Sequence, residues 1–183
     1  MIKKILHLIL ITFISIVLAS IYGIVHNQIS YTISEEYFTK FKFRTFGLGK
    51  FAIDFPRMSA GIIGVVSTWW FGLLIGLING IAGMLQPTVK LMWKGAFGAI
   101  IRVLIITILF GIVGVMIGKF VISNLNINWN LPENLINPKS FLTAGTMHSF
   151  GYIGGIIGLI YGVIFQIKMK KTNIQYLTDT DLK

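Results

Sequence analysis

The chain has 183 residues, of which 55% are hydrophobic and only 12% are charged, and its mean hydropathy is +0.80. About a quarter of the residues of a soluble domain are charged, because water must wet its surface, so this composition excludes a soluble globular fold. The net charge of +10 does not indicate nucleic-acid binding, since the lysines stand in short groups beside apolar runs, as expected of residues that contact anionic lipid head groups. The absence of cysteine excludes disulfides, thiol catalysis and cysteine-ligated metal sites.

The first apolar run, residues 5–25, follows Lys3 and Lys4 and is long enough for a transmembrane helix, which needs about 20 residues. A signal peptide would also begin with lysines, but its apolar core spans only about 7–15 residues and ends at a small-x-small cleavage site. Residues 18–23 fit such a site poorly. We therefore expect an uncleaved membrane anchor.

Three further apolar runs follow at residues 59–85, 96–118 and 141–167, and the only permanently charged residue in them is Arg102. The prolines lie between the runs, where they remove no helical hydrogen bond. The sequence thus predicts an all-α membrane protein, with one integral membrane domain over residues 1–183 and a bundle of four transmembrane helices.

The cationic residues near the helix ends set the expected orientation. Their numbers are nearly balanced between the two sides, so the first helix and the compact group Lys168, Lys170 and Lys171 decide. The expectation is an inner loop at residues 86–95, a cytoplasmic tail at residues 168–183 and both termini in the cytoplasm. The outer loops are then residues 26–57 and 119–140. Within the first outer loop, side-chain character alternates with a period of two, which predicts either two short β-strands or an aromatic and cationic segment lying on the outer interface.

Glycines recur at every fourth residue in the second and fourth predicted helices, which places them on one helix face and permits close approach of another backbone. These glycines are Gly72, Gly76, Gly80, Gly154, Gly158 and Gly162. We expect the two faces to pack inside the bundle; the alternatives are a homo-oligomer seam and a groove for another membrane subunit or a lipid. A faint similarity between the halves, which aligns His7 with Arg102 and Gly23 with Gly118, fits either duplication or chance.

Arg102 and Asn79 are expected at similar depth in the membrane, and we interpret them as a structural polar layer. The guanidinium of Arg102 is expected to reach the inner interface. The four runs contain no Asp or Glu. Ion-coupled transporters commonly hold their ion or proton on an intramembrane carboxylate, so this class of protein is disfavoured.

The predicted topology brings a set of potential ligands to the outer face, namely His26, Glu35, Glu36 and His148. Two imidazoles and a carboxylate could bind a divalent metal such as zinc, or serve as general acid and base. Nothing in the linear spacing makes them meet, and the alternative is a pair of interfacial histidines hydrogen-bonded to loop carbonyls. No other cofactor is predicted.

Several stretches carry a resemblance to a known family. Residues 22–31 read YGIVHNQISY and residues 36–39 read EYFT, while STWWFGL at residues 67–73 and HSFGY at residues 148–152 follow later. Together they resemble a family of small uncharacterised bacterial membrane proteins, whose pattern frequently has Asp at the position of Asn27. The resemblance implies a bacterial inner membrane location and draws attention to His26, Glu36 and His148, but it implies no reaction.

The leading functional expectation is a structural, assembly or interaction component of the inner membrane. One alternative is a membrane-embedded enzyme or metal-binding protein using the outer His and Glu residues. A second alternative is a passive pore or lipid-binding protein that uses the glycine faces.

Overall fold

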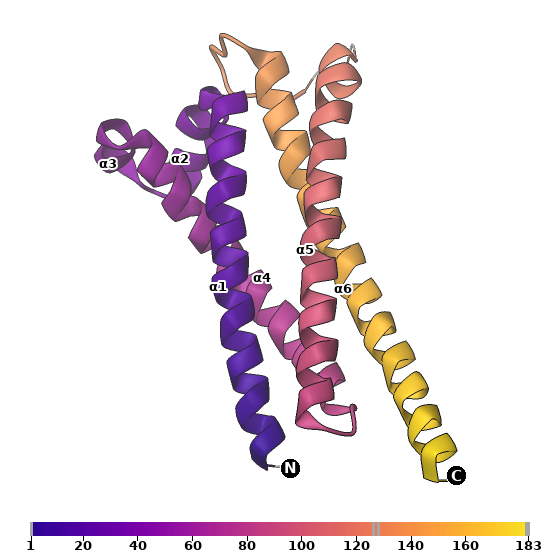
Figure 1. Cartoon of the computed structure of the whole chain (residues 1–183). Helices are drawn as coiled ribbons and strands as arrows, with labels where there is room; N and C mark the ends of the chain where they lie inside the picture. Colours follow the sequence, from indigo (N-terminus) through magenta and orange to yellow (C-terminus); the bar gives the residue numbers. More distant parts are fainter. Residues whose placement is uncertain (1, 126, 128, 182–183) are drawn as a thin grey trace.

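Four helices long and apolar enough to cross a membrane dominate the computed structural model, which describes residues 2–125, 127 and 129–181, with side chains as far as residue 172 (Figure 1). They are α1 (Ile2–Ile33), α4 (Pro56–Met84), α5 (Val89–Phe120) and α6 (Pro138–Asp181). The predicted all-α, four-helix architecture is therefore confirmed. The first turn of α1 and the last turns of α6 lie at the same end of the bundle, as an even number of crossings requires.

The helix boundaries follow local sequence signals. Pro56 occupies the first turn of α4, where its missing N–H breaks no hydrogen bond. Thr88 caps α5, because its hydroxyl accepts a hydrogen bond from the backbone N–H of Leu91. At the other end of α4, the Lys4 ammonium donates to the carbonyl oxygens of Met84 and Gln86, at 3.0 and 2.6 Å. A cation at a helix C-terminus is favourable, so Lys4 joins the start of α1 to the end of α4.

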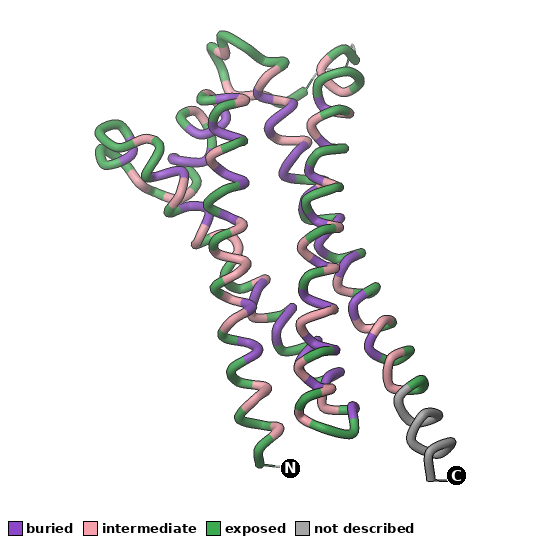
Figure 2. The backbone as a smooth tube through the Cα atoms, viewed as in Figure 1, coloured by how far each residue is buried: buried purple, intermediate pink, exposed green. Residues whose placement is uncertain are grey.

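The helices associate as two hairpins, α1 with α4 and α5 with α6, and contacts between the hairpins are fewer. Glycines lie at the closest approaches within each hairpin. A Cβ added to Gly76 would lie 2.6 Å from the Thr12 Cα, and one added to Gly158 would lie 2.9 Å from the Val103 Cα. Figure 2 shows buried and exposed positions alternating along each of the four spans. Many of the exposed positions carry large apolar side chains, as expected of surfaces that contact lipid.

The two hairpins use corresponding contacts. With the numbering shifted by 95 between α1 and α5, as in the alignment of Gly23 with Gly118, and by 78 between α4 and α6, several close approaches of the first hairpin correspond to ones of the second. Gly80 lies against Leu8 as Gly158 lies against Val103, and Thr68 contacts Gly23 as Thr146 contacts Gly118. The hairpins therefore repeat a packing register as well as an order of elements.

The outer loop after α1 is helical, so the alternative of two short β-strands is wrong for the described residues. Helix α1 continues to Ile33, and a π-helix η1 (Tyr37–Lys42), α2 (Phe43–Thr45) and α3 (Gly49–Asp54) follow it. Three aromatic residues of this segment, Tyr37, Phe38 and Phe43, are buried in one apolar cluster with Tyr31 of α1 and Phe141 of α6. Burial of bulky aromatics against α6 holds the segment in helical turns. The runs of alternating side chains in the sequence were too short to distinguish a strand from a helix.

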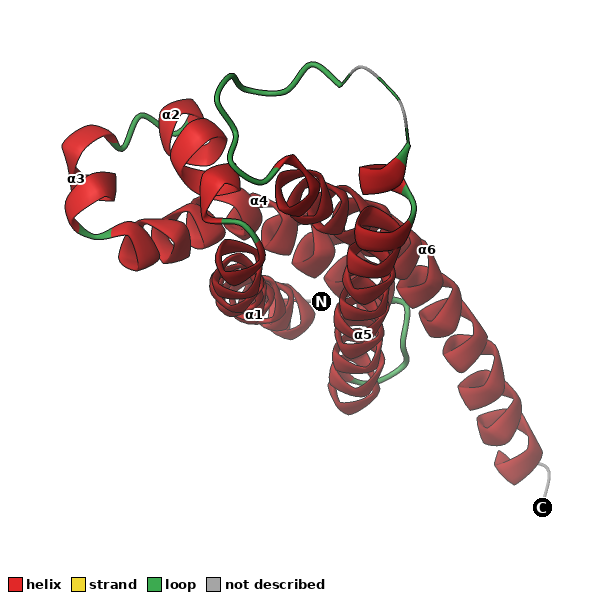
Figure 3. Ribbon diagram, turned by 90° about the horizontal axis from the view of Figure 1, so that it is seen from above, coloured by secondary structure: helices red, strands yellow, loops and turns green. Residues whose placement is uncertain are grey.

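The two outer loops are tied together into a cap. Viewed from above, the loop between α5 and α6 arcs along one side of the outer end of the bundle, with α2 beside it (Figure 3). The Glu36 carboxylate accepts hydrogen bonds from the backbone N–H groups of Ile136 and Asn137, at 2.8 and 2.7 Å. At the opposite end, α6 extends through the predicted tail as far as Asp181, and residues 182 and 183 of that tail lie outside the described residues.

Candidate functional site

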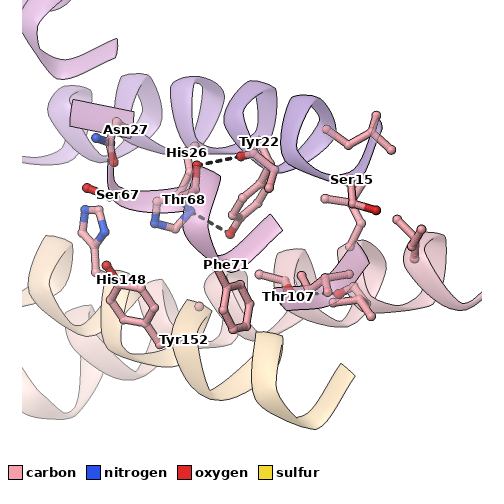
Figure 4. A pocket seen from close by; sticks show the side chains of 18 residues that line it. Ser15, Tyr22, His26, Asn27, Ser67, Thr68, Phe71, Thr107, His148 and Tyr152 are labelled. Atoms are coloured by element: carbon pink, nitrogen blue, oxygen red, sulfur yellow. Dashed lines mark hydrogen bonds between the residues drawn. The ribbon is translucent and has the colours of Figure 1, made fainter. Parts of the chain in front are cut away.

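A cavity of about 80 Å³ lies between the two hairpins and is lined by residues of all four spanning helices. Its walls are mostly apolar, and most of its polar side chains lie around His26 and His148, while Ser15 and Thr107 lie toward the other end (Figure 4). Those polar residues include Tyr22, His26 and Asn27 of α1, Ser67 of α4, and His148 and Tyr152 of α6. The combination of apolar walls and a few polar groups is typical of small-molecule sites.

His26 and His148 meet at the outer end of the cavity. Their ring centroids are 4.7 Å apart with an interplanar angle of 73°, and each residue is only 8% exposed. The His26 Nδ1 atom shares a hydrogen bond with the Tyr22 hydroxyl, and the His148 Nε2 atom shares one with the Ser30 hydroxyl, both at 3.0 Å. In the described part of the chain, no hydrogen bond occupies His26 Nε2 or His148 Nδ1, so each imidazole keeps one nitrogen for a ligand.

Helical spacing explains how α1 supplies half of this arrangement. Tyr22, His26 and Ser30 are four residues apart, which places them on one face of the helix, turned toward α6. Small residues on the opposing helices make room for the ring: a Cβ added to Gly111 or Gly151 would lie 3.8 or 3.6 Å from the His26 Cε1 atom. The imidazole of His26 thus lies between the two hairpins.

The cap closes the site from the outside. Tyr37, the first residue of the π-helix, stacks on His148 with ring centroids 5.1 Å apart and an interplanar angle of 20°. Single π-helical turns are rare and frequently occur at functional sites. A third contribution comes from α4, whose Ser67 is one of the lining residues. Its hydroxyl oxygen is buried and has no hydrogen-bond partner among the residues that the structure describes. A buried hydroxyl without a partner is uncommon, and a polar group bound close to it would supply the missing hydrogen bond.

The two predicted glutamates do not join the histidines. Glu35 is exposed, and both oxygens of the Glu36 carboxylate are engaged by Ile136 and Asn137, whose N–H groups lower the Glu36 pKa. Among the residues that the structure describes, no three His, Cys, Asp or Glu side chains gather closely enough to hold a metal. Because zinc sites use three or four protein ligands, the described donors do not form a zinc site by themselves.

The predicted polar layer separates into two unrelated contacts. Arg102 donates to the Gly98 carbonyl at 2.7 Å and lies 3.8 Å from the centre of the Phe165 ring. Asn79 instead accepts at 3.1 Å from the side-chain amide of Gln166, a residue that sequence reasoning missed.

Sequence reasoning also missed most of the histidine site's partners. The spacing of four from His26 could have indicated Tyr22 and Ser30, because residues so spaced share a helix face. No comparable signal existed for Tyr37 or Ser67, which reach the site only through packing of the cap and of α4.

Comparisons of the chain with protein-family models, with curated proteins and with solved structures found no match. Its function is therefore inferred from the residues of the site.

Proposed function

We propose that this chain is a ligand-binding protein of the bacterial inner membrane, which holds a narrow molecule between its two helical hairpins at the pair of histidines. The observation that carries the proposal is the meeting of His26 and His148 at 4.7 Å inside a cavity, each with one ring nitrogen that no described hydrogen bond uses. Polar and ionisable side chains within a bilayer are costly, and they are retained mainly where they have a function.

The size of the cavity limits the ligand. An engineered cavity of about 150 Å³ can hold benzene, so about 80 Å³ suits a few carbon atoms or a small polar group. A haem or a nucleotide would not fit. The site favours a slender amphipathic molecule, with its polar end at the imidazoles and its apolar part between Phe71 and Ile75 of α4 and the helices opposite.

The membrane orientation is part of the proposal. Lys3, Lys4, Lys90 and Lys94 lie near the ends of α1 and α5 that are far from the cap, and cationic residues of this kind favour the cytoplasmic side. With both termini in the cytoplasm, the histidine site lies in the outer half of the bilayer, beneath the external cap.

A second candidate function, an assembly or interaction component, is supported by α3. This helix projects away from the bundle (Figure 1), and its Ile53 side chain is 79% exposed, with Phe51 and Phe55 also exposed. An apolar ridge of this kind suits the membrane interface or a neighbouring membrane subunit.

The experiment uses the third histidine as a matched control. His7 also lies on α1, but its Nδ1 accepts a hydrogen bond from Trp93 near the first turns of the helix, and it does not line the cavity. Wild type, His26→Gln, His148→Gln and His7→Gln would be purified in maltoside detergent, and their bound molecules and zinc identified by mass spectrometry.

We expect a small molecule to co-purify with wild type and His7→Gln and to be lost from the two site variants. Zinc that followed the same pattern would support a metal-binding form of the site, completed by ligands outside the described residues. Equal small-molecule and zinc contents in four folded proteins would contradict the proposal.

A further inference from the structure

A polar cleft of about 510 Å³ lies at the outer end of the second hairpin, where α5 ends and α6 begins. Sites for small ligands commonly have volumes of about 300–1,000 Å³. Lys119 lines the cleft from α5 and Lys139 lines it from α6, and most of the other lining residues carry hydroxyl or amide groups. The cleft shares no lining residue with the cavity at the histidines, so it is a separate site.

The two lysines make the cleft positively charged. Among the residues that the structure describes, no Asp or Glu lines it. Glu36 bonds to the backbone of the neighbouring loop, at Ile136 and Asn137, but it is not a lining residue. The side-chain oxygen of Asn137 accepts the backbone N–H of Ser140 at 3.0 Å, so the first turn of α6 is already capped. The positive charge of the cleft therefore comes from its lysines rather than from the helix end.

Asn124 holds Lys139 in place across the cleft. The Lys139 ammonium donates to the Asn124 side-chain oxygen at 2.8 Å, and the Asn124 side-chain nitrogen donates to the Phe120 carbonyl at the end of α5, at 3.2 Å. Since an ammonium has three N–H donors, this arrangement leaves two on Lys139 for a ligand. The Lys119 ammonium lies 5.6 Å from the centre of the Phe120 ring, near the outer limit of a cation–π interaction at about 6 Å.

The cleft lies at the level expected for lipid head groups. Lys119 directly follows the apolar run 96–118, and Lys139 stands just before the run 141–167. A stripe of exposed apolar side chains descends α5 from Lys119 at spacings of three and four residues, which places it on the same helix face as the lysine. Each of its residues is more than half exposed; they are Met116, Ile112, Leu109 and Ile105.

We propose that this cleft binds the head group of an anionic phospholipid, with the phosphate between Lys119 and Lys139 and the acyl chains along the stripe below Lys119. Phosphate oxygens accept charge-assisted hydrogen bonds from ammonium groups, and basic pockets between membrane helices suit anionic head groups. A glycerol head fits best, because its hydroxyls can bond to the polar walls, whereas a choline head would bring a cation against two lysines. The inference does not depend on the histidine site.

The test measures lipid binding to the full chain by native mass spectrometry from maltoside micelles, which carry no phosphate. Dioctanoyl phosphatidylglycerol has an anionic head and two chains. Dioctanoyl phosphatidylcholine has the same phosphate and chains with an added cation, and inorganic phosphate has the charge alone.

The variants change two cations at a time. Lys119→Gln with Lys139→Gln removes the charges of the cleft, and Lys119→Arg with Lys139→Arg keeps them. The matched control is Arg44→Gln with Lys50→Gln, because these exposed cations belong to α2 and α3 of the same cap and do not line the cleft.

We expect phosphatidylglycerol to bind wild type about tenfold more tightly than phosphatidylcholine does. The glutamine pair in the cleft should bind it about tenfold or more weakly than wild type, while the arginine pair and the control pair stay within about threefold. The unfolding temperature of the glutamine pair without lipid should match that of wild type, since exposed lysines contribute little to stability. His26→Gln should leave lipid binding unchanged.

Four results would overturn the proposal. Equal binding of the two lipids to wild type would do so whether or not any variant folds. Equal losses in the cleft pair and the control pair would show attraction by overall charge. Inorganic phosphate that binds as tightly as phosphatidylglycerol, with the same dependence on Lys119 and Lys139, would assign the cleft to a free anion. Loss of phosphatidylglycerol binding in His26→Gln would place the lipid at the histidine cavity instead.

Discussion

Gly23 of α1 and Gly64 of α4 bring the two helices of the first hairpin into backbone contact. A Cβ added to Gly23 would collide with the Gly64 carbonyl group, and one added to Gly64 would lie 2.8 Å from the Ile24 backbone nitrogen. Neither backbone can give way without moving its helix. This contact fixes the hairpin one turn from His26, so packing here determines where the imidazole lies.

We expect Gly64→Ala to destabilise the protein by about 1–3 kcal/mol, the usual cost of overpacking a tight interface. Gly61 is the matched control, because it lies one turn away on α4 and a Cβ there would meet its nearest neighbour, the Gln28 side-chain nitrogen, at 3.5 Å. Gly61→Ala should be neutral or slightly stabilising, since alanine favours helix. Unfolding in increasing dodecyl sulfate, followed by circular dichroism, measures both variants. Equal losses of stability in Gly64→Ala and Gly61→Ala would show that the close contact between Gly23 and Gly64 does not determine the stability of the hairpin.

The spans could be predicted from the sequence because lipid imposes a simple rule: long apolar runs must satisfy their own backbone hydrogen bonds, and only helices do so. The prolines and the Thr88 cap then fix the ends. No such rule applies to the external cap formed by the two outer loops. Its segments are short, and packing of Phe38 and Tyr37 against α6 decided between strand and helix.

The candidate site was half predictable for a related reason. Topology alone placed His26 and His148 at the same end of the bundle, but their meeting depends on the rotation of α1 and α6, which small residues such as Gly151 permit. Glu36 was expected beside them and is instead held by backbone amides of the other loop. Sequence shows which loops share a side of the membrane, whereas partner choice within a loop depends on tertiary packing.

The polar layer offers a test of which buried residues act together. Gln166 donates from its side-chain amide to the backbone carbonyl of Asn79 at 2.9 Å and to its side-chain oxygen at 3.1 Å, while Arg102 bonds to Gly98. A double-mutant cycle of Asn79→Leu and Gln166→Leu should give a coupling energy of about 1 kcal/mol, within the range measured inside membranes. The cycle of Asn79→Leu with Arg102→Gln should give a value near zero. A larger coupling to Arg102 would restore the joint polar layer.

The Glu36 link predicts an acid-sensitive cap. Backbone N–H groups of Ile136 and Asn137 lower the Glu36 pKa from its ordinary value of 4.5. A carboxylate whose pKa is lowered by folding contributes stability that is complete above the ordinary pKa and is lost as the pH falls through the lowered value. The second outer loop should therefore stay docked at pH 5 and above and loosen only below about pH 4.5.

Hydrogen exchange of the Ile136 and Asn137 amides, corrected for intrinsic rates, measures this link. Glu36→Gln should speed their exchange several-fold at neutral pH and remove the acid dependence, because a neutral amide cannot replace both charge-assisted bonds. The exposed neighbour Glu35 is the control, and Glu35→Gln should leave exchange unchanged. Unchanged exchange in Glu36→Gln would show that other contacts hold the loop.

The orientation of the bundle can be tested directly because the chain has no native cysteine. Ile136 is 93% exposed at the capped end, whereas Lys90 and Lys171 are exposed toward the opposite end, on α5 and α6. With the cap outside, a membrane-impermeant maleimide should label Ile136→Cys in intact spheroplasts and should label Lys90→Cys and Lys171→Cys only after lysis. The reverse pattern would place the histidine site toward the cytoplasm, and the ligand would then have to arrive from inside the cell. Labelling of Lys90→Cys and Lys171→Cys from opposite sides would contradict the paired crossings of α5 and α6.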